Sequence, residues 1–207
     1  MRDSLIIVGC FLVGVVVALA GFMPEWLPMD QLTTWGLYLL LFCVGLGMGM
    51  DATFFRTVKE IPLSSLLLPL YTVVGSLLGG LAAWLLVQVI YPTPPVSLLD
   101  SAALSSGFGY YSLSSVLLDE ARGPFIATIA LAANLLRELL TLLLAPMIRK
   151  GFGPFAVISA GGATSMDTTL PAVVANSGNA YAAVSVYHGF VLTVAVPFIV
   201  TFFISLY

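Results

Sequence analysis

The stretch Gly161-Gly162-Ala163-Thr164-Ser165-Met166-Asp167-Thr168-Thr169-Leu170-Pro171 determines how the rest of the chain is interpreted. It is polar and rich in glycine, it carries an acid, and it lies within a very apolar chain. A lipid bilayer does not tolerate irregular backbone unless protein or a water-filled cavity covers it. The stretch is therefore either a surface loop or the working part of a membrane protein.

Composition decides in favour of the membrane. Of the 207 residues, 60% are hydrophobic and 8% are charged, whereas soluble domains carry about 25% charged residues. We therefore predict an all-α polytopic membrane protein. A net charge of −3 without a basic face excludes a nucleic-acid binder. Cys10 and Cys43 lie in apolar runs and the chain has 1 histidine, so we expect no disulfide, metal site or cofactor.

Some segments have the length of membrane-spanning helices, which need about 20 mostly apolar residues. We predict about five of them, at 4–23, 33–50, 62–91, 124–148 and 179–207. Arg2 and the A-x-A pattern at 18–20 would also fit a signal peptide. The length of the apolar run favours a spanning helix.

Two other segments, 96–122 and 154–178, are each broken by a polar, glycine-rich middle. The middle of the first is Ser105-Ser106-Gly107-Phe108-Gly109-Tyr110-Tyr111-Ser112, and the middle of the second is the stretch at 161–171. Each apolar half has about ten residues, which span half a membrane. Each segment either crosses the membrane with an unwound middle or returns to the same side as a hairpin.

Charge favours hairpins. Lys and Arg concentrate in cytoplasmic loops, and hairpins place Arg149 and Lys150 on the same side as Arg56 and Lys59. The predicted layout is a three-helix unit over 1–95 and a transport core over 96–207, in the inner membrane, with Met1 inside and Tyr207 outside. The hairpins enter from opposite faces and meet near the midplane, where secondary transporters bind substrates and ions.

A polar stripe lies on the helix between the two hairpins. Asn134, Arg137, Glu138 and Thr141 are spaced i, i+3, i+4, i+7 and share one face. A charge at the centre of a membrane helix costs roughly 2.5–3.5 kcal/mol, so the stripe must line a cavity or find partners. The alternative is that Arg137 and Glu138 lock two helices together, each through a different partner, because neighbours on a helix do not face each other.

Asp167 is the second intramembrane acid, and the hydroxyls of Thr164, Ser165, Thr168 and Thr169 surround it in the sequence. The alternative is a cytoplasmic loop in which Asp167 caps the following helix. The N-terminus of a half-helix suits a substrate carboxylate. Two acids suit a proton, Na⁺ or an ammonium group, and an amino acid carries both an ammonium and a carboxylate.

The polar residues around the two acids are predicted to bind the substrate: Asn134, Arg137, Thr164, Ser165, Thr168 and Thr169. The tip of the first hairpin supplies further candidates for substrate binding. Tyrosine hydroxyls and ring faces can hold a cation, although tyrosines also anchor proteins at membrane interfaces. The candidates at this tip are Ser106, Gly107, Gly109, Tyr110, Tyr111 and Ser112. His188 is either a proton relay or a helix-packing donor, and we expect Asp100 to be solvated.

An enzyme is a weaker alternative. Ala175-Asn176-Ser177-Gly178 together with His188 is similar to a serine intramembrane protease motif, but the leading glycine is missing. We therefore predict no enzymatic activity. A structural subunit of a larger transporter is a third alternative, and the intact polar residues argue against a purely passive role.

The sequence resembles the lysine exporter LysO family over essentially the whole chain. The resemblance rests on Ser106-Gly107-Phe108-Gly109-Tyr110-Tyr111-Ser112-Leu113-Ser114, Asn134-Leu135-Leu136-Arg137-Glu138-Leu139, Gly162–Pro171 of the opening stretch, and His188-Gly189-Phe190. It implies export of L-lysine and of toxic analogues such as thialysine, in exchange for protons. It also implies that Glu138 and Asp167 hold the proton and the substrate ammonium.

Members of that family typically look longer, with an additional helical unit at the N-terminus. The resemblance therefore implies that a small membrane partner subunit supplies this unit, or that the chain assembles as a homo-oligomer. The remaining alternative for the function is a sodium-coupled carrier of another small amino or organic acid.

Overall fold

The computed structural model describes residues 63–91 and 95–207, together with isolated positions between 13 and 50. The chain divides into two compact units, Met1–Gly49 and Met50–Tyr207, and the fold below is that of the second unit. The helices predicted at 4–23 and 33–50 lie outside the described residues, apart from those isolated positions. The three-helix unit predicted over 1–95 therefore stays a prediction.

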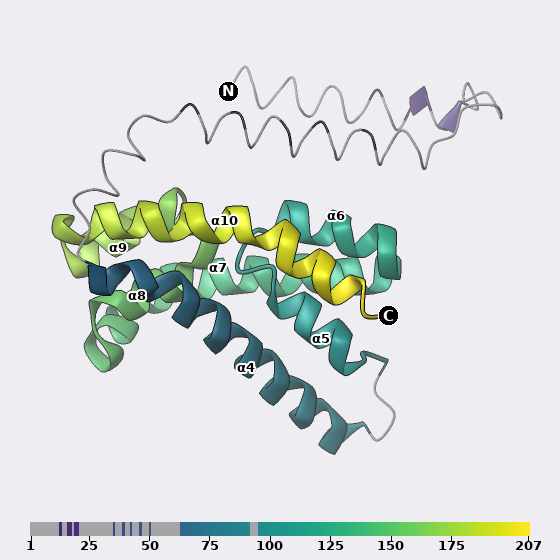
Figure 1. The fold of residues 1–207 in the computed structure, drawn as a ribbon, viewed down its shortest axis with the longest axis horizontal. Helices are drawn as coiled ribbons and strands as arrows, with labels where there is room; N and C mark the ends of the chain where they lie inside the picture. Colours follow the sequence, from purple (N-terminus) through teal and green to yellow (C-terminus); the bar gives the residue numbers. More distant parts are fainter. Residues whose placement is uncertain are drawn as a thin grey trace. The chain divides into compact units, whose positions relative to one another are not determined.

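The described part of the second unit contains helices, turns and loops and no strand, as predicted for an all-α protein (Figure 1). Its elements in chain order are η1 Leu63–Leu67, α4 Leu68–Ile90, α5 Leu98–Ser105, α6 Tyr111–Arg122, α7 Pro124–Phe152, α8 Pro154–Gly161, η2 Gly162–Met166, α9 Leu170–Ser177, η3 Asn179–Tyr181 and α10 Ala182–Ile204. Among the described residues, three helical stretches are long and apolar enough to cross a membrane: Ser65–Ile90, Pro124–Phe152 and Asn179–Ile204. They correspond to the predictions at 62–91, 124–148 and 179–207.

The ends of the long helices follow from local chemistry. Pro69 lies in the first turn of α4, where its missing N–H costs no helical hydrogen bond. The helix α7 extends four residues beyond the predicted end at 148, because Gly153, with φ of 91°, is the residue that stops it. Arg149 and Lys150 consequently lie in the last turn of α7, where cations interact favourably with the helix dipole.

Both broken segments fold as hairpins. The first hairpin consists of α5 and α6, and its two outer ends are joined by Arg122, whose Nε and Nη2 donate to the carboxylate of Asp100 at 2.8 and 3.1 Å. The second hairpin consists of α8, η2 and α9. There the hydroxyl of Ser177 donates to the carbonyl oxygen of Pro154 at 3.3 Å. The prediction of hairpins is thus confirmed, and crossing segments with unwound middles are excluded.

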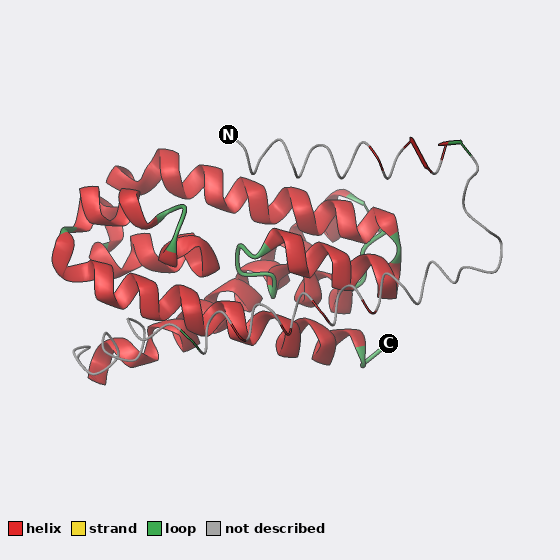
Figure 2. Cartoon of the chain, turned by 90° about the horizontal axis from the view of Figure 1, so that it is seen from above, coloured by secondary structure: helices red, strands yellow, loops and turns green. Residues whose placement is uncertain are grey.

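The two hairpins point toward each other. The first opens beside the C-terminal end of α10 and the second beside its N-terminal end (Figures 1 and 2). Their tips meet directly, because the N–H of Ala163 donates to the carbonyl oxygen of Phe108 at 2.7 Å. The predicted meeting of opposed tips is therefore present.

Glycines allow this close approach. Gly162 has φ of 67°, and a Cβ at this position would collide with the carbonyl oxygen of Phe108. Gly189 on α10 faces the carbonyl oxygen of Ala163 and the backbone of Met166, where a Cβ would also be too close. Small residues at these points let the second tip lie against both the first tip and α10.

An apolar cluster supports the second hairpin. Its buried members come from α4, α7, α8, α9 and α10: Leu68, Ala145, Val157, Ile158, Val173 and Val184. Because lipid is as apolar as these side chains, the cluster stabilises the fold through close packing rather than by exclusion from water.

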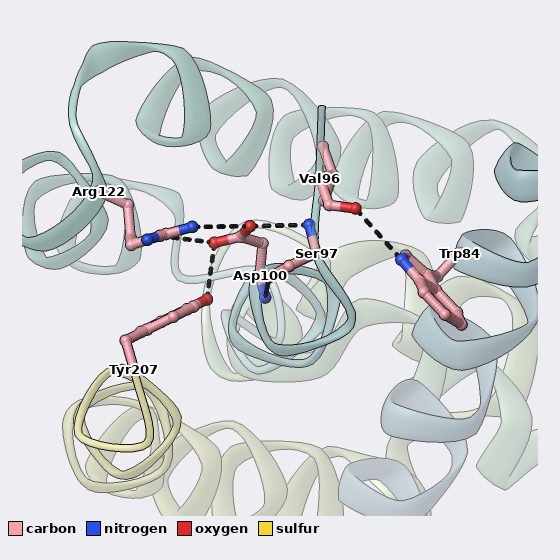
Figure 3. A network of polar contacts seen from close by, with 6 residues as sticks. All are labelled: Trp84, Val96, Ser97, Asp100, Arg122 and Tyr207. Atoms are coloured by element: carbon pink, nitrogen blue, oxygen red, sulfur yellow. Dashed lines mark hydrogen bonds and ion pairs between the residues drawn. The ribbon is translucent and has the colours of Figure 1, made fainter. Parts of the chain in front are cut away.

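Asp100 is buried, not solvated as expected from the sequence. Its side chain is 1% exposed and receives four hydrogen bonds (Figure 3), two from Arg122 and one each from the Tyr207 hydroxyl at 2.6 Å and the Ser97 N–H at 2.8 Å. The guanidinium of Arg122 also lies 4.0 Å from the ring centre of Tyr207. The prediction was wrong because the antiparallel hairpin brings Arg122 to Asp100, and the end of the chain brings Tyr207.

This network sets the ionisation of its members. Burial opposes the charged form of Asp100, but the hydrogen bonds from Arg122, Tyr207 and Ser97 outweigh it and hold the pKa of its carboxyl well below the usual range. Burial and the hydrogen bond to Asp100 raise the pKa of Tyr207 to about 12. Tyr207 therefore remains a proton donor at neutral pH.

We predict that Asp100→Asn lowers the thermal unfolding midpoint of the purified protein at pH 7 by about 3–10 °C, because a charged acceptor is lost from the network. A lowered pKa stabilises the fold above the unfolded carboxyl pKa of about 3.9 and loses this effect only as the pH falls through the lower folded pKa. The full contribution is thus present at pH 7. Asp119→Asn, the same change at an exposed site on α6, should leave the midpoint within about 1 °C, and equal shifts in the two variants would contradict the prediction.

A second prediction concerns the contact between the tips. Gly162→Ala should destabilise the protein by at least about 2 kcal/mol, because alanine must adopt a glycine backbone conformation and also displace Phe108. Gly151→Ala provides the control, since no atom lies within 4 Å of the added Cβ. Chemical or thermal unfolding measures both variants, and a Gly162→Ala protein as stable as the control would refute the contact.

Candidate functional site

The polar stripe of α7 is distributed between the two tips. Asn134 is buried and contacts the tip of the first hairpin. Its Oδ1 accepts from the N–H of Gly109 at 2.7 Å. Its Nδ2 donates to the Ser114 hydroxyl at 3.3 Å and to Ala130 O at 2.8 Å. Thr141 is also buried, and its hydroxyl donates to the carbonyl oxygen of Arg137. Of these two residues, Asn134 contacts a hairpin tip and Thr141 bonds within α7.

Arg137 serves the second hairpin. Its Nε donates to Ala160 O at 2.9 Å and its Nη2 to Ser159 O at 2.8 Å, both at the C-terminal end of α8. Its Nη1 donates to the hydroxyl of Ser76 on α4 at 2.9 Å. Hydrogen bonds from a charged group are worth about 1.5–3 kcal/mol each, so three of them offset the roughly 2.5–3.5 kcal/mol cost of the charge.

Glu138 is left without a comparable partner. Its side chain is half-buried, and it forms no hydrogen bond or ion pair with a described residue. The ion pair found in the described part of the chain is that of Asp100 with Arg122, so Arg137 and Glu138 do not pair with each other. Glu138 follows Asn134 by one helical turn, which places this acid on the same face as the residue that holds the first tip.

Asp167 lies at the exposed end of η2 in the second tip. Its Oδ1 accepts from the neighbouring N–H of Thr168 at 2.6 Å, and it forms no ion pair with a described residue. The residue that caps α9 is Thr169, and no side chain caps this helix. Asp167 is therefore not the helix cap that was its alternative role, and it interacts electrostatically with Tyr110 of the first tip.

The remaining predicted site residues fall into two groups. Several hydroxyls bond within the protein: Ser106 to Ala102 O, Thr164 to Gly161 O and Thr169, and Ser165 to Ser185 O. Other side chains have no hydrogen-bond partner among the described residues and remain available to a ligand: Tyr110, Tyr111, Ser112 and Thr168. Gly107 and Gly109 contribute close backbone approaches, to Asn134 and to Gly161 respectively.

His188 is fully buried on α10. Its Nδ1 lies 3.0 Å from the Ser165 hydroxyl and its Nε2 lies 2.8 Å from the Thr72 hydroxyl. Because Ser165 donates its proton to Ser185 O, Nδ1 of a neutral His188 donates to Ser165 and Nε2 accepts from Thr72. The Thr72 hydroxyl also lies 3.1 Å from Leu68 O, so these two acceptors compete for its single proton. His188 thus joins the second tip to α4, and the proton relay stays a prediction. Ser177, its counterpart in the protease-like pattern, bonds instead to Pro154 O.

Two functional contacts were missed by the sequence analysis. Thr72 and Ser76 carry hydroxyl groups one turn apart on the apolar helix α4. This spacing was the signal in the sequence that the two residues contact neighbouring helices. They line a groove of about 860 Å³ between α4, α7 and α8, which Arg137 also lines. Glu138 does not line this groove, so the two charges of the stripe face different surroundings.

Comparisons with known proteins agree with the sequence motifs. The model of the family described as "Lysine exporter LysO" matches residues 8–204. An Escherichia coli protein described as lysine exporter LysO is 34% identical over 206 residues, which cover 97% of this chain and 64% of that protein. A Haemophilus influenzae protein described as a putative lysine exporter is 31% identical over 193 residues, which cover 89% of this chain and 93% of that protein.

No solved structure matches this chain. The family match nevertheless extends over both hairpins, the stripe of α7 and the contacts of α10. The chain belongs to the lysine exporter LysO family.

Proposed function

We propose that the chain is an inner-membrane secondary transporter that exports L-lysine and toxic lysine analogues such as thialysine in exchange for protons. The observation that carries the proposal is that no described cation neutralises two acids, Glu138 on the helix between the hairpins and Asp167 in the second tip. Uncompensated acids at such a position are expensive unless they bind a cation. The relatives described as lysine exporters support lysine as that cation.

Lysine has two ammonium groups and a carboxylate, and the site offers complementary chemistry. Glu138 and Asp167 can each hold an ammonium group or a proton, and Tyr110 adds a hydroxyl and a ring face. The helix α6 begins at Tyr111 without a side-chain cap, so its first N–H groups suit the carboxylate. Protons arriving from outside would then displace lysine from the acids.

The proposed orientation in the membrane is based on the charges. Arg149 and Lys150 lie at the end of α7 beside the second hairpin, and the positive-inside bias places this end in the cytoplasm. The first hairpin, with Asp100 and Tyr207 at its base, would then open to the outside. Assembly with a small membrane partner subunit or as a homo-oligomer is part of the proposal.

The proposal predicts that Glu138→Gln and Asp167→Asn each reduce lysine export at least about tenfold, because each removes a charge that binds the substrate or the proton. Efflux of labelled lysine from cells expressing the chain, with its amount in the membrane measured in parallel, provides the test. Asp119→Asn on α6 is exposed and should export like the wild type. Full export by either site variant would refute the assignment of the acids.

The coupling ion is tested separately. In proteoliposomes loaded with a pH-sensitive dye, addition of lysine on one side should move protons in the opposite direction, and Glu138→Gln should abolish this movement. Lysine transport without proton movement would refute antiport. In that case a dependence on Na⁺ would indicate a sodium-coupled carrier instead.

A further inference from the structure

The end of α8 shows what Arg137 does. A helix leaves its last four carbonyl oxygens without helical partners, and here all four are satisfied. Gly162 N–H bonds to Ile158 O, Arg137 bonds to Ser159 O and Ala160 O, and the Thr164 hydroxyl bonds to Gly161 O. Arg137 thus supplies half of the partners at the point where the second hairpin turns.

The guanidinium of Arg137 also has a partner on the side away from α8. Ser76 on α4 accepts the hydrogen bond from Nη1, and a Cβ on Gly162 would lie 3.3 Å from the Cζ of Arg137. The edge of the guanidinium formed by Nε and Nη2 is occupied by the two carbonyl oxygens. A carboxylate that binds arginine through two parallel hydrogen bonds would have to displace partners of this kind.

We propose that Arg137, with Ser76, is a positioning residue that fixes the second hairpin tip and its Asp167 for transport, and that it is not a ligand of the substrate. This inference rests on the proposed export function. It differs from the role of Arg137 expected from the sequence, which was substrate binding. Lysine cannot replace arginine here, because one ammonium group does not present the planar set of donors that three acceptors use.

Transport kinetics separate positioning from binding. In proteoliposomes, Arg137→Lys should lower the maximal rate of lysine transport about tenfold and leave the half-saturating concentration within about twofold. Ser76→Ala should lower the maximal rate about threefold, whereas Ser76→Thr, which keeps the hydroxyl, should retain the wild-type rate. The double variant Arg137→Lys/Ser76→Ala should be no slower than Arg137→Lys alone, since both changes remove one interaction.

A substrate ligand would behave differently. Arg137→Lys would then raise the half-saturating concentration at an unchanged maximal rate, and Ser76→Ala would leave both parameters unchanged. Either result overturns the proposal. Ser76→Ala is the milder change and keeps the test decisive if Arg137→Lys does not fold.

Hydrogen exchange provides a readout that does not depend on transport. In the protein reconstituted in lipid nanodiscs, Arg137→Lys and Ser76→Ala should each speed amide exchange in residues 159–167 at least about fivefold and leave residues 111–122 unchanged. Leu139→Ala, at an exposed site of the same helix, should leave both regions unchanged. Unchanged exchange at the second tip overturns the positioning role, whereas faster exchange in a chain that exports no lysine refutes the export function alone.

Discussion

Backbone polar groups in the middle of an apolar protein must find partners within the protein, and this constraint determines the arrangement of the two hairpin tips. Each tip interrupts a helix and leaves backbone groups without helical partners. The tips satisfy one another through Ala163 and Phe108, and α7 supplies Asn134 to the first tip and Arg137 to the second. Much of the polar stripe on α7 thus serves the backbone. Glu138 is the charged member of the stripe that forms no hydrogen bond or ion pair with a described residue.

The sequence allowed the architecture of the core to be predicted because the relevant properties are local. Half-length apolar segments around Gly107, Gly109, Gly161 and Gly162 indicated breaks, and the positions of Arg149 and Lys150 favoured hairpins over crossings. The structure confirms both hairpins and the meeting of their tips. The extension of α7 to Phe152 was missed because the basic residues were taken as the end of the helix, whereas Gly153 ends it.

The partners of the charged residues could not be predicted in the same way. Helical periodicity places Arg137 on a face, but it does not reveal that the carbonyls of Ser159 and Ala160 lie opposite. Asp100 was expected to be solvated because its partners are distant in the sequence, with Arg122 at a separation of 22 residues and Tyr207 at 107. Contacts of this range are set by the packing of whole helices. The roles of Thr72 and Ser76 remained hidden for the same reason.

The contacts of α4 have a consequence for the dimensions of the core. Every fourth residue along one face of this helix is bonded: Thr72 to His188, Ser76 to Arg137, Gly80 O to Ser101, and Trp84 to Val96 O. The first two contacts reach the region of the second hairpin and the last two reach the first hairpin. At 1.5 Å per residue this row is about 18 Å long, and its length depends on the helix alone. The helix α4 therefore fixes the distance between the two hairpins through its backbone rise. This distance does not depend on the apolar side chains that cover the helix.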